Sequence, residues 1–274
     1  QSNYIMKKCK TPLRYPGGKS KATKFLFDRE NLPLRPIKEY REPFLGGGSP
    51  AIAFTKMYPD IPVWVNDKYY NLYCFWSVLQ SDGYNLRDYI TELKLIHTEP
   101  EKAKELFIRC KNEINDQKDP FEIAWRFHVI NKCSFSGLTE NSTFSELSSI
   151  RNWTLTNIET LGYYHELIQN WKITNLDYRE LINDDPDTFI FLDPPYDLKK
   201  DYILGGGDGD KLYGKKGSMH QGFDHGDFRD QFLTTQSMCM ITYNSNPNIR
   251  TLFSDWEQVE WDLTYSMNNG HKSY

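Results

Sequence analysis

Residues 188–196, with the sequence TFIFLDPPY, constrain the fold of this chain more than any other stretch. Their β-branched and aromatic run predicts a buried strand, which stops abruptly at Asp193. Because ligands in open α/β sheets bind beyond the carboxyl ends of the strands, we expect Asp193 and Tyr196 to lie at a functional site. Pro194 and Pro195 fix the backbone and lack N–H groups, so this stiff segment has carbonyls free to accept hydrogen bonds. Such a site suits a flat ring that carries an amine; the alternative is an ordinary proline turn that closes a strand.

A second group of signals, a glycine loop between two predicted strands, precedes this segment in the chain. We expect a strand at 38–44, a helix at 50–58 with Ser49 as its N-cap, and a strand at 62–66. Gly46 and Gly48 would let the backbone approach a ligand closely. Asp67 follows the second strand, 19 residues beyond Gly48. This spacing is typical of a nucleoside site in which the acid accepts hydrogen bonds from the ribose hydroxyls.

The N-terminal segment reads as a turn at Gly17 and Gly18 that leads into a helix beginning near Lys19. Its ending resembles a nucleotide-triphosphate loop, but Leu13 stands where that motif needs a glycine, so we reject that assignment. The net charge of the chain is −4, whereas residues 1–30 hold eight basic and two acidic side chains. This local excess of positive charge is compatible with a nucleic-acid partner and equally with a solvated terminus.

The length of 274 residues suits one large α/β domain with an inserted subdomain. Charged helical stretches replace the strand pattern after residue 81, and we expect helices at 85–96, 99–115 and 120–130. We therefore assign 1–81 and 171–274 to one domain and 82–170 to the insert. A polar loop at 131–144 ends the helical part; its side chains could read base edges, or it could be a plain surface connection.

The sheet pattern returns near residue 171. We expect a strand at 171–176, a short helix opened by Asp177 and Tyr178, the strand that ends at Asp193, a helix at 223–235, and strands at 239–243 and 256–265. The stretch 197–226 is too rich in glycine and polar residues to pack, so we expect a mobile loop beside the site.

Composition excludes several classes of protein. The five cysteines are scattered without a C-x-x-C pair, and the six histidines show no ligand spacing, so we expect reduced thiols and no metal. No apolar run approaches the length of a membrane span, and no signal peptide is evident. We therefore expect no membrane partner and a cytoplasmic location.

Taken in order, these motifs resemble those of the Dam-like, D12 class DNA adenine-N6 methyltransferases, which use S-adenosylmethionine. The resemblance covers nearly the whole chain. It implies a three-layer, Rossmann-like α/β methyltransferase fold with a mixed, mostly parallel sheet. It also implies that the insert at 82–170 is a helical target-recognition subdomain, and that the chain methylates adenine site-specifically in double-stranded DNA. A cognate restriction endonuclease in a restriction-modification system is a further candidate partner.

The resemblance also implies roles for individual residues. The target adenine would be flipped into a catalytic site made by Asp193, Pro194, Pro195 and Tyr196. The cofactor-binding residues would be Tyr15, Gly17, Gly18, Lys19, Pro43, Phe44, Gly46, Gly48, Ser49, Asp67, Asp177, Tyr178 and Asp193. The DNA-binding residues would be Lys132, Phe135, Asn141, Lys215 and Lys216.

Three other functions could share part of this pattern. A methyltransferase acting on RNA or on protein glutamine could share the glycine motif, although glutamine enzymes more often resemble Asn-Pro-Pro-Tyr. A nicotinamide oxidoreductase would explain Gly46, Gly48 and Asp67 but would leave the segment from Asp193 to Tyr196 without a role. A non-catalytic DNA-binding module would bind DNA independently of S-adenosylmethionine and transfer no methyl group.

Overall fold

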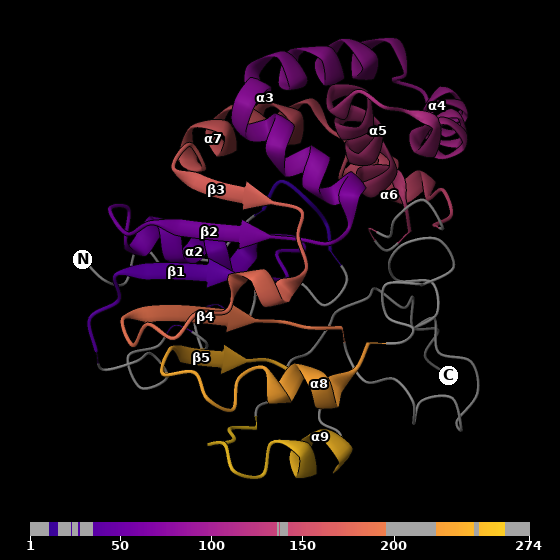
Figure 1. Ribbon diagram of the computed structural model, residues 1–274. Coiled ribbons are helices and arrows are strands. Elements are labelled where there is room, and N and C mark those ends of the chain that lie inside the picture. The colour runs from indigo at the N-terminus through magenta and orange to yellow at the C-terminus, as the bar shows by residue number, and fades with distance from the viewer. Residues whose placement is uncertain are drawn as a thin grey trace, which may run out of the picture.

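The computed structural model describes residues 11–15, 23, 27, 35–135, 137, 142–195, 223–243 and 247–260. Within them, five strands form one sheet in the order β3-β2-β1-β4-β5 (Figure 1). The strands are β1 (Glu39–Glu42), β2 (Val63–Asn66), β3 (Trp171–Thr174), β4 (Thr188–Leu192) and β5 (Met238–Ile241). The predicted α/β class is confirmed. The described strands all pair in parallel, so the mixed character that we expected is not seen among them.

Strand β4 is buried along its whole length, as its continuous apolar run predicts. Phe189 and Phe191 belong to one hydrophobic cluster, which includes residues of α2 (Ser49–Met57). Ile190 and Leu192 belong to a second cluster, which includes residues of α8 (His225–Asp230) and α9 (Pro247–Leu252). The alternation of side chains along a strand therefore fills two cores, one on each face of the sheet.

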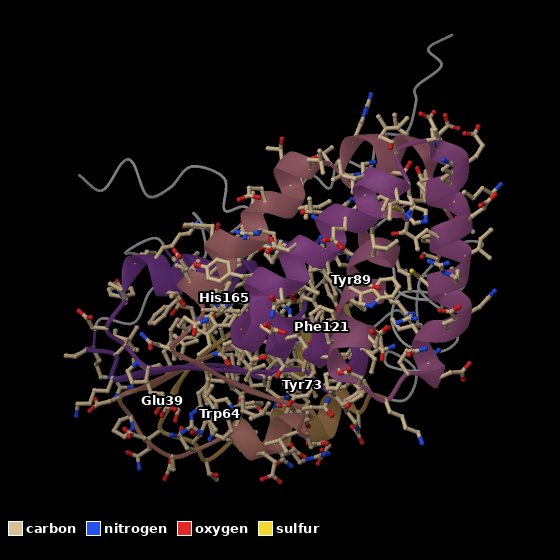
Figure 2. All side chains as sticks on the ribbon, turned by 90° about the horizontal axis from the view of Figure 1, so that it is seen from above. Glu39, Trp64, Tyr73, Tyr89, Phe121 and His165 are labelled. Carbon is tan, nitrogen blue, oxygen red and sulfur yellow. The ribbon has the colours of Figure 1, made fainter. Side chains whose placement is uncertain are left out.

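A helical part of the chain separates β2 from β3. It consists of α3 (Tyr70–Ile96), α4 (Pro100–Glu113), the 3-10 helix η1 (Ile114–Asp116), α5 (Pro120–Cys133), α6 (Glu146–Arg151) and α7 (Leu155–Leu167). Figure 1 shows these helices gathered beyond the β3 edge of the sheet. Helix α3 packs against both α5 and α7. The rings of Tyr89 and Phe121, labelled in Figure 2, join α3 to α5 with centroids 5.7 Å apart.

Helix α3 is interrupted at Asp82, where φ is −144° and ψ is 36°. The backbone is therefore bent at the residue with which we begin the inserted subdomain. Asp82 accepts a hydrogen bond from Asn85 Nδ2 at 2.6 Å, and this local bond competes with the helical pattern. The division into a sheet domain and a target-recognition subdomain stays a prediction.

Our prediction of a strand at 256–265 is wrong for its described part, 256–260. The Gln258 side chain donates hydrogen bonds to the carbonyls of Arg250 at 3.0 Å and Phe253 at 2.7 Å. These bonds hold the segment against the end of α9, so it does not extend along the sheet. The predicted helix at 223–235 is also shorter than expected, because α8 has six residues.

Candidate functional site

The loop after β1 turns at two glycines with positive φ, Gly46 at 52° and Gly48 at 77°. Side chains of L-residues rarely adopt this conformation. A Cβ atom on Gly48 would also lie 2.7 Å from ring atoms of Trp76, which belongs to α3. Trp76 Nε1 donates a hydrogen bond to the Gly46 carbonyl at 3.1 Å. The predicted glycine loop is therefore a tight structure supported by α3.

Gly48, and not Ser49, is the N-cap of α2, so this detail of our prediction is wrong. The Gly48 N–H donates to the Leu45 carbonyl at 3.0 Å, which closes a tight turn on a left-handed residue. The helix consequently begins one residue earlier than predicted, with Ser49 buried in its first turn. Pro50 lies in that first turn as expected, where its missing N–H costs little.

Tyr15 lies against the glycine loop. A Cβ on Gly46 would approach the Tyr15 ring within 2.8 Å, and one on Gly47 would lie 2.7 Å from Tyr15 Cβ. The preceding residue is fixed to the end of α5, because the Arg14 N–H donates to Asn131 Oδ1 at 2.8 Å. The Asn131 side chain returns a hydrogen bond to the Arg14 carbonyl. Three distant segments of the chain therefore meet at this loop.

Asp67, at the end of β2, is tied to the same loop. Its Oδ2 accepts from the Gly46 N–H at 3.0 Å, and its Oδ1 accepts from the Tyr69 N–H at 2.9 Å. Burial raises the pKa of Asp67 to about 6, although both backbone hydrogen bonds act to lower it. The structure thus brings together Gly46, Gly48 and Asp67, as the fingerprint predicts.

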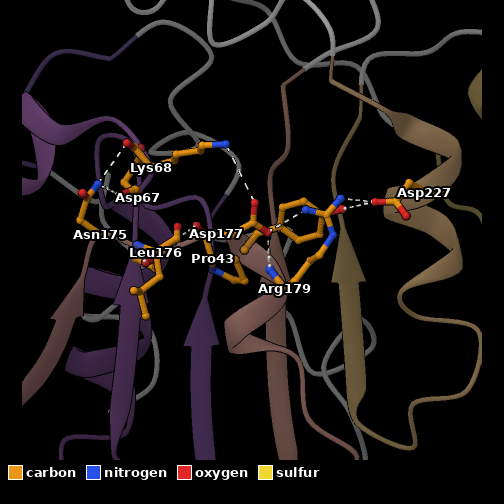
Figure 3. Close-up of polar contacts among 10 residues, drawn as sticks. Pro43, Asp67, Lys68, Asn175, Leu176, Asp177, Arg179 and Asp227 are labelled. Carbon is orange, nitrogen blue, oxygen red and sulfur yellow. Dashed lines mark hydrogen bonds and ion pairs between the residues drawn. The ribbon is translucent and has the colours of Figure 1, made fainter.

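Two asparagines, which we did not include among the site residues, hold the neighbouring strand ends together. Asn66 Nδ2 donates to the carbonyls of Pro43 at 3.1 Å and Leu176 at 2.9 Å. Asn175 Nδ2 donates to the carbonyls of Asp67 at 2.8 Å and Lys68 at 3.0 Å (Figure 3). The loops after β1, β2 and β3 are therefore joined by side-chain amides at the carboxyl edge of the sheet.

Phe44 and Tyr178, two of the predicted cofactor residues, come together at this edge. Their ring centroids are 5.4 Å apart, and both rings contact Phe223 and Phe228. Tyr178 begins the 3-10 helix η2 (Tyr178–Leu181), which Asp177 caps by accepting from the Arg179 N–H at 3.1 Å. The short helix predicted after Asp177 is therefore present.

Arg179 links Asp177 to α8. Its Nη1 donates to Asp177 Oδ1 at 3.1 Å, and its Nη2 pairs with the carboxylate of Asp227 (Figure 3). Lys68 Nζ approaches the other Asp177 oxygen at 3.9 Å. The Asp227 carboxylate has a lowered pKa, because it accepts a hydrogen bond from Arg179. Two basic side chains thus flank the carboxylate of Asp177.

Asp193 follows β4 directly, at the carboxyl end of the strand next to β1. Its Oδ1 accepts a hydrogen bond from Thr242 Oγ1 at 2.8 Å. Asp193 and Pro195 are half-buried, and Pro194 is buried. Because the chain passes from β1 outward in both directions, the gap between β1 and β4 is the switch point of the sheet. Asp193 and the glycine loop therefore lie beyond neighbouring strands at this point.

Glu42 is a third acid at the same edge, and our prediction left it out of the site residues. It ends β1, is 1% exposed, and accepts a hydrogen bond from the Tyr40 hydroxyl at 2.8 Å. Burial raises its pKa well above the usual range, and the charges of Asp193 and Asp67 raise it further. An acid at the end of a strand was the signal used for Asp67 and Asp193, and it applies equally to Glu42.

The predicted DNA-binding residues differ in their exposure. Phe135 is 63% exposed, and its N–H donates to the Thr143 carbonyl at 3.1 Å. Lys132 is 6% exposed, and burial together with the charge of Arg14 lowers its pKa to about 8. A buried ammonium is not placed to meet a phosphate at the surface. The roles of both residues stay predictions.

Several predicted site residues lie outside the described residues: Gly17, Gly18, Lys19, Tyr196, Asn141, Lys215 and Lys216. The predicted mobile loop falls there too, except for its last four residues. In the part of the chain that the structure describes, no group of three or more histidine, cysteine or acidic side chains could hold a metal ion. In that same part, no helix is long and apolar enough to cross a membrane.

Comparison with known proteins finds a family and two relatives that this chain resembles over most of its length. The profile of a family described as D12 class N6 adenine-specific DNA methyltransferase matches residues 15–267. The Type II methyltransferase M.MjaIII of Methanocaldococcus jannaschii is 26% identical over 199 residues, which cover 67% of this chain and 68% of the relative. The Type II methyltransferase M.CviBI of Paramecium bursaria Chlorella virus NC1A is 24% identical over 181 residues, covering 60% and 65%.

Proposed function

Because the chain belongs to the D12 class N6 adenine-specific DNA methyltransferases, we propose that S-adenosylmethionine is its methyl donor and that Asp193 lies in its catalytic site. The observation that carries this proposal is the position of Asp193 beside the glycine loop. The two follow β4 and β1, which are neighbours at the switch point of the sheet. A methyl donor held by the loop would therefore be next to Asp193.

The residues fit this cofactor chemically. Each oxygen of Asp67 accepts one backbone hydrogen bond and keeps a further lone pair, which a ribose hydroxyl could use. Gly46 and Gly48 carry no Cβ, so the backbone of the loop can approach the ligand closely. S-adenosylmethionine supplies a methyl group that its sulfonium already activates.

The remaining cofactor residues divide by chemistry. Asp177 would accept a hydrogen bond from the amine of the cofactor's adenine, and Tyr178 and Phe44 offer ring faces beside it. The pocket would be shaped by Pro43 in the loop, by Ser49 in the first turn of α2 and by the neighbouring Tyr15, together with Gly17, Gly18 and Lys19. Two basic side chains, Arg179 and Lys68, hold the Asp177 carboxylate near this edge of the sheet.

In the catalytic site, we assign hydrogen-bond acceptance to Asp193 and to the carbonyl of Pro194. Both would accept from the N6 amine of the target adenine, which directs the nitrogen lone pair toward the methyl group. Pro195 stiffens the segment, and Tyr196 would stack on the base. The adenine must leave the duplex to reach these groups, so the proposal includes base flipping.

The helical part, 82–170, is the proposed target-recognition subdomain for double-stranded DNA. Phe135, the most exposed of its described aromatic residues, offers a ring at the surface of this part. We propose that Asn141, Lys215 and Lys216 contact DNA, and we leave out Lys132 because its side chain is buried. Because both relatives are named Type II methyltransferases, a cognate restriction endonuclease is a candidate partner, and we expect the enzyme to act in the cytoplasm.

The test is to incubate the protein with S-adenosylmethionine tritiated in its methyl group and with one of three acceptors: duplex DNA, RNA or a glutamine peptide. We expect label in N6-methyladenine of the duplex, and we expect Asp193→Ala to abolish most of it. Label found only in RNA or only in the peptide would contradict the proposal that duplex DNA is the substrate. A protein that binds DNA but transfers no label with any acceptor would favour the binding-module alternative.

A further inference from the structure

We infer that Thr242 is a positioning residue for methyl transfer, because its hydroxyl holds the Asp193 carboxylate in one orientation. The inference rests on the proposed function, in which Asp193 accepts a hydrogen bond from the target amine. Thr242 belongs to none of the motifs identified in the sequence. It follows β5, on the side of β4 away from the glycine loop.

The sheet itself places Thr242 beside Asp193. Strands β4 and β5 are parallel, with Leu192 in register with Ile241, so the next residue of each strand lies at the same edge. The Thr242 N–H donates to the Leu192 carbonyl at 2.9 Å and continues the ladder by one step. This backbone bond fixes the position from which the Thr242 side chain reaches Asp193.

The hydroxyl of Thr242 has one proton to donate. Its Oγ1 lies 2.8 Å from Asp193 Oδ1 and 3.4 Å from the Leu192 carbonyl, so the carboxylate is the closer acceptor. Thr242 is 2% exposed, so water does not compete with Asp193 for the proton of its hydroxyl. Threonine is also branched at Cβ and stiff at χ1, so its hydroxyl direction is well defined.

A fixed carboxylate matters because its orientation decides where the other lone pairs point. The torsion between the carboxylate and Cβ is broad in an unrestrained aspartate, so an unfixed group would sample many directions. Holding Oδ1 on Thr242 restricts this rotation before the substrate binds. Catalytic groups must be held near the productive geometry, and a small misplacement can cost a large factor in rate.

Two substitutions test this inference. Thr242→Val keeps the shape of the side chain and removes the donor, whereas Thr242→Ser keeps the donor and removes a methyl group. In single-turnover transfer with saturating S-adenosylmethionine and duplex DNA, we expect Thr242→Val to be slower by about tenfold to a hundredfold, because a small misplacement of a catalytic group can cost about a hundredfold in rate. We expect Thr242→Ser to stay within about threefold of wild type, and both variants to bind the cofactor as wild type does.

Thr251→Val is the matched control, because it makes the same change on α9, where the Thr251 hydroxyl donates to the Pro247 carbonyl. It should leave the transfer rate unchanged. A Thr242→Val protein with the wild-type rate would overturn the inference, and so would a Thr242→Ser protein as slow as Thr242→Val. The Asp193→Ala background separates the two claims. If Thr242→Val has no further effect there while Asp193→Ala alone is slow, both stand; if Asp193→Ala alone is fast, the catalytic assignment itself fails.

Discussion

The carboxylate of Asp67 accepts a hydrogen bond from the backbone N–H of Gly46 at 3.0 Å. The acid that ends β2 is therefore joined to the loop that ends β1, and the two predicted parts of the nucleoside site form one unit. The same bond keeps the carboxylate in partly buried surroundings, which raise the pKa of Asp67 to about 6. Cofactor binding and protein stability should consequently depend on pH in opposite ways.

The first prediction is that the affinity for S-adenosylmethionine rises as the pH increases through about 6, because the ionised Asp67 is the stronger acceptor for ribose hydroxyls. Asp67→Asn should lower the affinity by about tenfold or more and remove this pH dependence. Titration calorimetry between pH 5 and 7.5 measures both effects. Asp60→Asn, an exposed change before β2, should behave as wild type. An unchanged affinity in Asp67→Asn would refute the ribose assignment.

The pKa of Asp67 also predicts the sign of a stability effect. The folded state raises this pKa from 3.8 to about 6, so it binds the proton more tightly than the unfolded state does. The stabilising contribution is fully present below pH 3.8 and is lost as the pH rises through 6. Urea unfolding should show that the free energy of unfolding of wild type falls across this pH range relative to that of Asp67→Asn. Equal pH dependence in the two proteins would contradict the prediction.

A third prediction separates catalysis from binding at Asp193. Asp193→Ala should lower the single-turnover transfer rate by about a hundredfold or more, while cofactor and DNA binding persist. Tyr196→Phe should keep much of the activity, because its ring can still stack. Tyr196→Ala should weaken the binding of the flipped base by roughly 1–3 kcal/mol, the value typical of a base stacked on an aromatic side chain. An Asp193→Ala enzyme with the wild-type rate would return this segment to the status of a strand-ending turn.

A fourth prediction concerns the backbone of the glycine loop. Gly48→Ala should destabilise the fold by at least about 1–2 kcal/mol, because an L-residue is strained at this left-handed position. The added methyl group would also meet the Trp76 ring. Gly226→Ala is the control, since its Cβ would lie at an ordinary 3.4 Å from the Asp224 carboxylate. Urea unfolding compares the two, and equal midpoints would contradict the strain.

Lys132 offers a fifth prediction. Its pKa falls from 10.5 to about 8 in the folded state, so burial of the charged form opposes folding. Between about pH 8 and 10.5 the unfolded state binds more protons, and stability should rise with pH. Lys132→Met should therefore be more stable than wild type at pH 7.5, by roughly 2–3 kcal/mol, with a margin that shrinks at higher pH. Lys118→Met, at an exposed lysine, should keep the wild-type pH slope.

The sequence predicts β4 and its strand-end acid well, because a strand buried on both faces needs a continuous apolar run. It also predicts the meeting of Gly46 and Asp67, since parallel strands bring their carboxyl ends to one edge. It fails at 256–260, where Trp256 packs against the second hydrophobic cluster and Val259 is exposed, although their spacing resembles that of a strand. Local spacing carries no information about which distant surface a segment will cover.

The contacts that complete the site are those that spacing could not predict. Thr242 donates to Asp193 at the end of the neighbouring strand, 49 residues away in the chain. Asn66 donates to the carbonyl of Leu176, although the whole helical part separates the two residues in the chain. Each bond joins segments far apart in the chain, so it depends on strand order, which periodicity does not determine. Lys132 illustrates the same limit: its place in a polar stretch indicates exposure, whereas α5 packing buries it.

The path of the chain between β2 and β3 bears on how fast the protein can fold. These neighbouring strands pair from Val63 with Trp171 to Asn66 with Thr174, yet α3 to α7 all lie between them in the chain. Closing so long a loop costs entropy before the pairing is formed, and folding slows as contacts become more distant in sequence. We therefore expect β3 to join the sheet late, after the helices between β2 and β3 have formed and have brought these two strands closer together.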